Sequence, residues 1–70
     1  MMKRHEPVHA LDAQYICSFR PDGEGGYHVR CKAFPGLITF GETLEEARHN
    51  AKEALERSAA RYLRAIEGSV

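Results

Sequence analysis

Two alternating runs, residues 14–20 and 27–32, constrain the fold of this chain more than any other feature. A period of two places alternate side chains on one face of a strand. The segment between the runs, 21–26, holds a proline, an aspartate and three glycines, which favour a turn. The sequence therefore predicts a β-hairpin. The positions expected on its buried face are Tyr15, Cys17, Phe19, Tyr27, Val29 and Cys31.

A second turn and a third strand are predicted directly after the hairpin. Pro35 and Gly36 form a Pro-Gly pair, which marks a turn over residues 33–36. The apolar and β-branched residues 37–40 follow it, and we interpret them as a short strand. Short connections favour antiparallel neighbours, so the three strands form a meander.

The register of the third strand decides which apolar side chains face solvent. If Leu37 and Thr39 point into the core, then Ile38 and Phe40 point outward, and Ile16 of the first strand joins them. Such a patch is a surface for association. A slip of one residue would instead bury Ile38 and Phe40. The sequence leaves both registers open.

A long helix follows the strands and begins with a capping box. The Thr43 hydroxyl can accept a hydrogen bond from the N–H of Glu46, whose carboxylate can reach back to the N–H of Thr43. Apolar side chains then recur at spacings of three and four, which predicts an amphipathic helix over residues 44–66. These positions are Leu44, Ala47, Ala51, Ala54, Leu55, Tyr62 and Ile66.

Together these elements predict an α+β domain of order β-β-β-α, in which one long helix covers one face of a three-stranded antiparallel meander. The polar residues 1–13 are interpreted as an N-terminal arm, and residues 14–70 as the domain. A helix over 44–66 is roughly 34 Å long, whereas strands of five or six residues cover about 17–20 Å. The last helical turns, with Tyr62 and Ile66, should therefore overhang the sheet, where the arm or a second chain would cover them.

Charge and hydropathy exclude several classes of protein. Ten Lys and Arg balance ten Asp and Glu, which argues against a protein that binds nucleic acid through charge alone. No apolar run reaches the ~18 residues of a membrane span, and the first residues lack the apolar stretch of a signal peptide. We therefore expect a cytoplasmic chain with reduced cysteines, and nucleic acid is not an expected partner.

The side chains that could carry chemistry do not form a recognisable site. His5 and His9 are spaced like metal ligands on a helix, but Pro7 lies between them and opposes that helix. Cys17 and Cys31 should be neighbours on adjacent strands, and we interpret them as buried apolar side chains. The expectation is therefore a protein without enzymatic activity, metal or cofactor.

An ordered set of motifs resembles the HicB antitoxin family over most of the chain. The motifs are a Gly-Gly-Tyr hairpin, a Pro-Gly turn, and a Gly-Glu-Thr-Leu-Glu-Glu-Ala helix start. The resemblance implies a partial ribonuclease-H-like fold without catalytic carboxylates. It also implies a partner, a HicA-type toxin, which is a small RNA-cutting enzyme whose active site the antitoxin covers. The residues that carry the resemblance are Gly25, Gly26, Tyr27, Pro35, Gly36, Gly41, Thr43 and Glu46.

Two hypotheses for function follow from these observations. In the first, the chain is an antitoxin or a related binding module that neutralises a HicA-type toxin sterically. In the second, it keeps the fold but is an orphan oligomer that binds another protein or a small ligand. Both include a homodimer or larger homo-oligomer, because a chain of this size buries little surface alone. The candidate self-association residues are Ile16, Ile38, Phe40, Tyr62 and Ile66.

Overall fold

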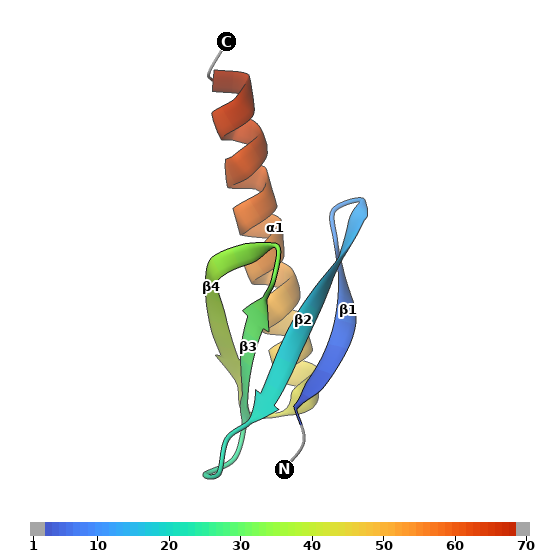
Figure 1. The fold of residues 1–70 in the computed structure, drawn as a ribbon, viewed down its shortest axis with the longest axis vertical. Helices are drawn as coiled ribbons and strands as arrows, with labels where there is room; N and C mark the ends of the chain where they lie inside the picture. The colour runs from blue at the N-terminus through green and yellow to red at the C-terminus, as the bar shows by residue number, and fades with distance from the viewer. Residues whose placement is uncertain (1–2, 69–70) are drawn as a thin grey trace.

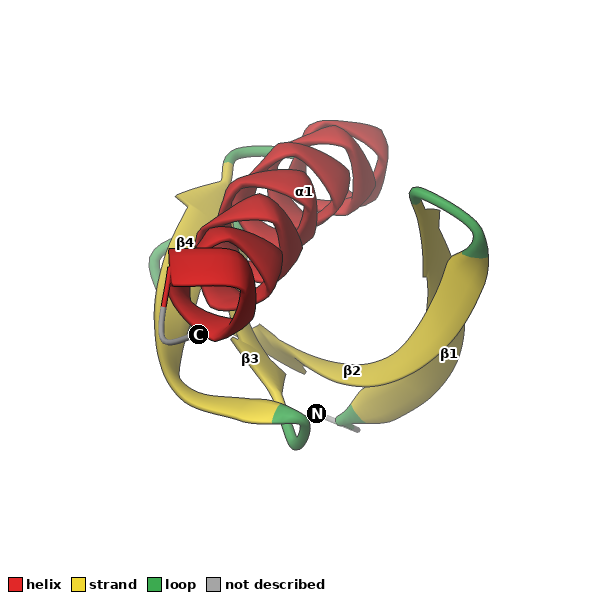
Figure 2. Ribbon diagram, turned by 90° about the horizontal axis from the view of Figure 1, so that it is seen from above, coloured by secondary structure: helices red, strands yellow, loops and turns green. Residues whose placement is uncertain are grey.

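The computed structural model describes residues 3–68, without the side chains at 63 and 65–68. Four strands, β1 (Arg4–Ala10), β2 (Ala13–Pro21), β3 (Tyr27–Cys31) and β4 (Phe34–Gly41), precede the helix α1 (Leu44–Gly68). The strands form one antiparallel sheet in the order β1-β2-β3-β4. The sheet curves around one side of α1, as Figure 2 shows. The α+β class and the antiparallel meander are confirmed.

The prediction of three strands is wrong by one, because part of the expected arm is strand β1. Residues 4–10 pair with β2 throughout, from Arg4 opposite Phe19 to Ala10 opposite Ala13. Two features hide this strand in the sequence. Only Val8 and Ala10 are buried on it, and Pro7 is tolerated in strands chiefly at a sheet edge.

The predicted turn at 33–36 is also wrong. The turn lies at Lys32 and Ala33, and β4 already begins at Phe34, which pairs with Cys31. The regular register resumes only at Ile38, opposite Arg30. The Pro-Gly pair thus belongs to an irregular stretch of β4 rather than to the reversal of the chain.

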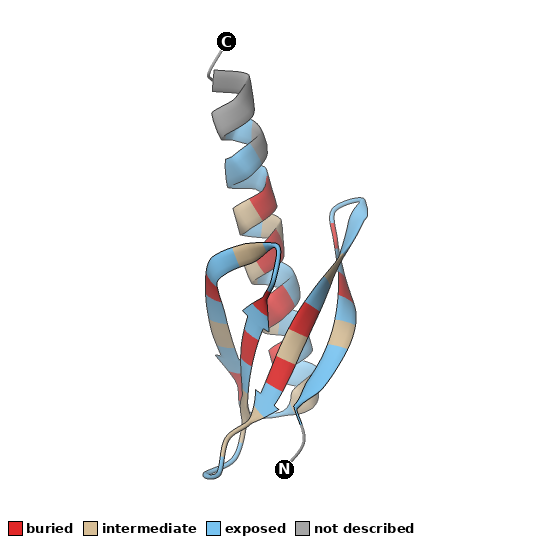
Figure 3. Ribbon diagram, in the orientation of Figure 1, coloured by how far each residue is buried: buried red, intermediate tan, exposed pale blue. Residues whose placement is uncertain are grey.

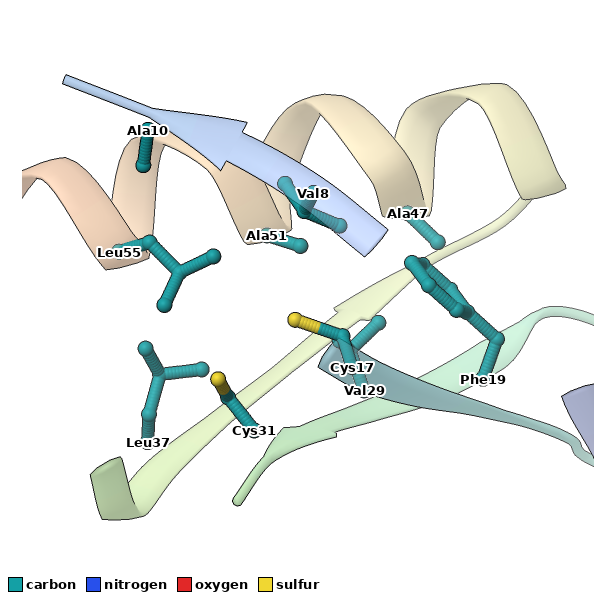
Figure 4. Packing of buried hydrophobic residues seen from close by; sticks show 10 residues of the cluster. All are labelled: Val8, Ala10, Cys17, Phe19, Val29, Cys31, Leu37, Ala47, Ala51 and Leu55. Carbon is teal, nitrogen blue, oxygen red and sulfur yellow. The ribbon is translucent and has the colours of Figure 1, made fainter. Parts of the chain in front are cut away.

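Buried side chains from every strand meet one stripe of α1 (Figure 4). Phe19, Val29, Cys17 and Leu55 are fully buried, and nothing polar is buried among the described residues. Alanines line the helix where it crosses the sheet, which lets the backbones approach closely. The cluster is Val8, Ala10, Cys17, Phe19, Val29, Cys31, Leu37, Ala47, Ala51 and Leu55.

The start of α1 is fixed by its cap and by a glycine. The N–H of Glu46 donates to the Thr43 hydroxyl at 3.0 Å, as predicted, but the Glu46 carboxylate accepts from the N–H of Glu42 at 3.4 Å rather than from Thr43. A Cβ on Gly41 would lie 2.3 Å from the backbone nitrogen of Ala47. Only glycine therefore lets β4 end against the first turn of the helix.

The far half of α1 extends beyond the sheet, as expected from the lengths (Figure 1). Its 25 residues span about 37 Å at 1.5 Å per residue. Burial stops at Ala59, and the described side chains beyond it are exposed (Figure 3). Over residues 3–68, no helix is both long and apolar enough to cross a membrane.

Candidate functional site

An apolar groove lies beside the overhanging part of α1, between the β1–β2 turn and the β3–β4 turn. It encloses about 640 Å³, and we call it the distal groove. The rings of Tyr15 and Phe34 form part of its wall, with centroids 5.5 Å apart and planes tilted by 52°. Its main lining residues are Leu11, Tyr15, Phe34, Ala59 and Tyr62.

Leu11 and Tyr62 expose unusually large apolar areas at this groove. Leu11 is 54% exposed and Tyr62 61% exposed. Leu11 also has a φ of 56°, a left-handed conformation that strains a bulky side chain. A glycine at the first central position of such a two-residue turn would avoid that strain. The chain thus holds an apolar side chain in solvent at a position where leucine is unfavourable.

The opposite surface of the sheet, which faces away from α1, carries both cationic and apolar side chains, and we call it the outer face. Ile38 is 62%, Ile16 54% and Phe40 41% exposed, whereas Leu37 is buried. The register with Ile38 and Phe40 outward is therefore confirmed. Ile38 and Phe40 are neighbours on β4, but Ile16 on β2 is separated from them by the polar side chains of β3, so the three do not form one patch.

A hollow of about 500 Å³ on the outer face holds several of its polar side chains, with Ile38 at its wall. Lys3, from the expected arm, lies beside Arg20 and Arg30 there. Alternation in β2 and β3 had already placed Arg20 and Arg30 on the polar side. Lys3 could be assigned to this face only once β1 was known to be a strand.

Asp22 organises the turn at the edge of this hollow. Its carboxylate accepts from the N–H of Glu24 at 2.9 Å and lies 2.7 Å from Nε2 of His28. The Glu24 N–H, followed by the His28 contact, lowers the pKa of Asp22 below its ordinary value. The turn thus keeps an ionised carboxylate that is already engaged by two local partners.

Cys17 and Cys31 lie opposite each other on β2 and β3, as expected, and both are free and buried. Burial, with a further contribution from Cys31, raises the pKa of the Cys17 thiol to about 12. A thiol that stays protonated is a poor nucleophile and metal ligand. These cysteines serve the core.

One ion-pair cluster joins β1 to α1 at the end of the sheet away from the distal groove. Arg48 donates from Nε and Nη2 to the two carboxylate oxygens of Glu6, at 2.8 and 2.9 Å, and Arg4 lies 3.0 Å from the same carboxylate. The Arg48 hydrogen bonds are the main reason that the pKa of Glu6 is lowered.

The predicted site residues are thus divided between two surfaces. Ile16, Ile38 and Phe40 are on the outer face and Tyr62 is at the distal groove, while the side chain of Ile66 lies outside the described residues. The sequence predicted that the arm carrying Val8 and Leu11, or a second chain, covers the overhanging helix, and Leu11 does lie beside Tyr62 in the groove. Phe34 was missed because it belongs to a segment interpreted as a turn. Between residues 3 and 68, no group of three His, Cys, Asp or Glu is placed to hold a metal ion.

Comparison of the chain with models of known protein families, with curated proteins and with solved structures found no match.

Proposed function

We propose that this chain is a protein-binding module of the HicB antitoxin type, with a partial ribonuclease-H-like fold, that neutralises a HicA-type toxin by covering it. Steric neutralisation requires shape and apolar area rather than reactive groups. A toxin that cuts mRNA acts in the cytoplasm, so the proposal places this chain there as well.

The distal groove is the observation that supports the proposal best. Leu11, Tyr15, Phe34 and Tyr62 come from four separate segments and converge on one hollow. Aromatic side chains in such hollows dominate the energetics of many protein interfaces. The strained φ of Leu11 adds support, because local strain that does not help folding often marks a functional position.

Co-expression with a HicA-type toxin encoded beside this chain tests the proposal. The two proteins should co-purify, and growth arrest by the toxin should be relieved. Tyr62→Asp should weaken the complex by tenfold or more, since losses of about 2 kcal/mol are typical when a central aromatic contact is removed. Ile38→Asp is the matched control, because Ile38 is 62% and Tyr62 61% exposed, yet Ile38 lies on the outer face.

Failure of the toxin to co-purify, or equal effects of both substitutions, would contradict the proposal. The alternative, an orphan oligomer, predicts that the distal groove holds a second copy of the chain. In that case Tyr62→Asp would convert the oligomer seen by light scattering to a monomer, whereas under the first hypothesis Tyr62→Asp would leave the oligomeric state without toxin unchanged.

A further inference from the structure

The acidic residues of this protein are almost absent from the outer face, although the chain as a whole is neutral. Of the ten Asp and Glu, only Asp22 lines the hollow there. Glu6 is turned toward Arg48 of the helix, and the remaining acids lie in turns, just before α1, or on α1 itself. The net charge of zero thus results from an outer face with an excess of cations and from turns and a helix that carry most of the acidic residues.

The cations of the outer face form no close ion pairs among the described residues, although the charge of Arg20 contributes to the lowered pKa of Asp22. Lys3, Arg20 and Arg30 line one hollow, and Lys32 lines an adjoining one with Arg30. Over the described residues, none of these four side chains takes part in a salt bridge. The one nearby carboxylate, Asp22, is held by His28 and by the Glu24 N–H. Cations so placed favour a ligand with several negative charges.

An aromatic platform lies beside these cations. Phe40 pairs across the strands with His28, and their ring centroids are 5.2 Å apart. Phe40 lies over Gly26, where a Cβ would come within 2.3 Å of the ring. The carbonyl of Phe40 accepts a 2.7 Å hydrogen bond from the Asn50 side chain. The close approach of Gly26 to the ring and the anchored backbone thus fix the position of the partly exposed Phe40.

The sheet register sets the platform and the cations next to each other. Arg20, His28 and Phe40 form one row across β2, β3 and β4. The next row on the same face is Ser18, Arg30 and Ile38. Neighbouring positions on one face of a strand are about 7 Å apart, at 3.3–3.4 Å per residue. An extended ligand can therefore contact cations and rings at once.

We propose that the outer face binds single-stranded nucleic acid, with backbone phosphates at Arg20, Arg30 and Lys3 and a base stacked on Phe40. Cationic grooves combined with aromatic side chains are the general solution for binding single strands. A duplex keeps its bases stacked internally, so it could not use the platform. An acidic polypeptide would use the cations but would have no comparable use for the ring. This proposal does not depend on the distal groove or on a toxin.

Fluorescence anisotropy with a labelled oligouridine of about 16 nucleotides tests the proposal on the full chain. Three phosphate contacts predict a slope of roughly −2 for the logarithm of the association constant against that of the salt concentration, or about 20-fold weaker binding between 50 and 200 mM. The double variant Arg20→Glu/Arg30→Glu should lose at least tenfold in affinity. Arg57→Glu/Arg64→Glu makes the same charge change at exposed positions of α1 and should remain within about twofold of the original affinity.

A substitution that leaves the charges intact separates nucleic acid from other anions. Phe40→Ala should weaken oligouridine binding about tenfold, the effect of losing one stacked base, without changing the salt slope. Absence of binding at about 50 mM salt, or equal losses in the two double variants, would overturn the proposal. Equal binding of polyglutamate, with no effect of Phe40→Ala, would overturn it in favour of an acidic protein partner. If a variant fails to fold, the proposal is still tested by the salt dependence of oligouridine binding to the unaltered chain.

Discussion

The outer face belongs to the sheet alone, whereas the distal groove is lined by two strands, two turns and α1, and the two surfaces differ in nearly every physical property. The outer face carries unpaired cations, histidines and one supported aromatic ring. The groove is mainly apolar and lies where the helix outgrows the sheet. One small fold can thus present two chemically distinct surfaces, because strand alternation separates the faces and helix length opens the groove. A substitution in the core should therefore abolish binding at both surfaces, whereas a substitution on one surface should change binding at that surface alone.

The largest effect that we expect is unfolding of the whole domain when the core is disrupted, which would remove both surfaces. Phe19 is fully buried, and Phe→Ala substitutions at such sites cost about 3–5 kcal/mol. That approaches the whole stability of a domain of this size, so Phe19→Ala should be largely unfolded by circular dichroism. Ile16→Ala, on the outer face of the same strand, should change the free energy of unfolding by only about 0.5 kcal/mol.

A smaller effect, confined to the outer face, is expected for Gly26→Ala. The new Cβ would meet the Phe40 ring, and Gly26 also has a φ of 85°. Residues forced into such conformations cost about 1–3 kcal/mol. Urea unfolding should show a loss in this range, together with weaker oligouridine binding and unchanged toxin binding. Gly25→Ala is the informative control, since Gly25 shares the positive φ but has nothing within 4 Å of its Cβ position. Equal loss of oligouridine binding in both variants would show that the contact with Phe40 is irrelevant.

How far sequence reasoning succeeded also differs between these surfaces. Alternation identified the hairpin, and it correctly assigned Arg20, His28 and Arg30 to one face, because a central strand with one buried face has a strong period. The arrangement of that face depended on β1, whose buried positions are only Val8 and Ala10. An edge strand with a proline and several charges carries a weak pattern, so the strand was missed and Lys3 with it.

The groove was harder to predict because it depends on tertiary geometry rather than on a period. The predicted helix is longer than the predicted strands, and this comparison correctly indicated that the end of the helix extends beyond the sheet and that Tyr62 is exposed. Leu11, by contrast, lies in a turn, and Phe34 directly follows one at the irregular start of β4, where no repeat shows which way a side chain points. The two-residue turn at Leu11 and Asp12 carries no glycine or asparagine signal. The strain at Leu11 could therefore be found only in three dimensions.

Leu11→Gly should separate the distal groove from the outer face, because it should increase the stability of the fold while it weakens toxin binding at the groove. Glycine removes the strain of a positive φ, which is worth roughly 1 kcal/mol, and the exposed leucine side chain contributes little to the core. The melting temperature should rise by about 4–8 °C for each kcal/mol gained in a domain of this size. Toxin binding should weaken because an apolar contact is lost, while oligouridine binding stays the same. A variant that becomes less stable would show that Leu11 supports the fold rather than a partner.

The smallest effect should come from the ion pairs that join β1 to α1, whose contribution to stability is present at neutral pH and is lost in acid. The Arg48 hydrogen bonds lower the pKa of Glu6 from its ordinary value of 4.5 in the folded protein. A carboxyl whose folded pKa is lowered stabilises the fold above the unfolded pKa, and that contribution is lost as pH falls through the folded value. The urea midpoint should therefore decrease below about pH 4.5, and by less in Glu6→Gln than in the original chain.

Since the Glu6 ion pairs lie at the opposite end of the sheet from the groove, toxin binding by Glu6→Gln at neutral pH should equal that of the original chain. Lys52→Gln is a useful control, because its contact with Glu56 is 3.9 Å long and exposed, and such pairs contribute little. Identical pH profiles for Glu6→Gln and the original chain would mean that the ion pairs do not help to hold β1, which would then depend on its pairing with β2 and on the buried Val8 and Ala10. Weaker toxin binding by Glu6→Gln would instead show that loss of the ion pairs shifts β1 and, with it, the turn at Leu11. The two ends of the sheet would then not be independent.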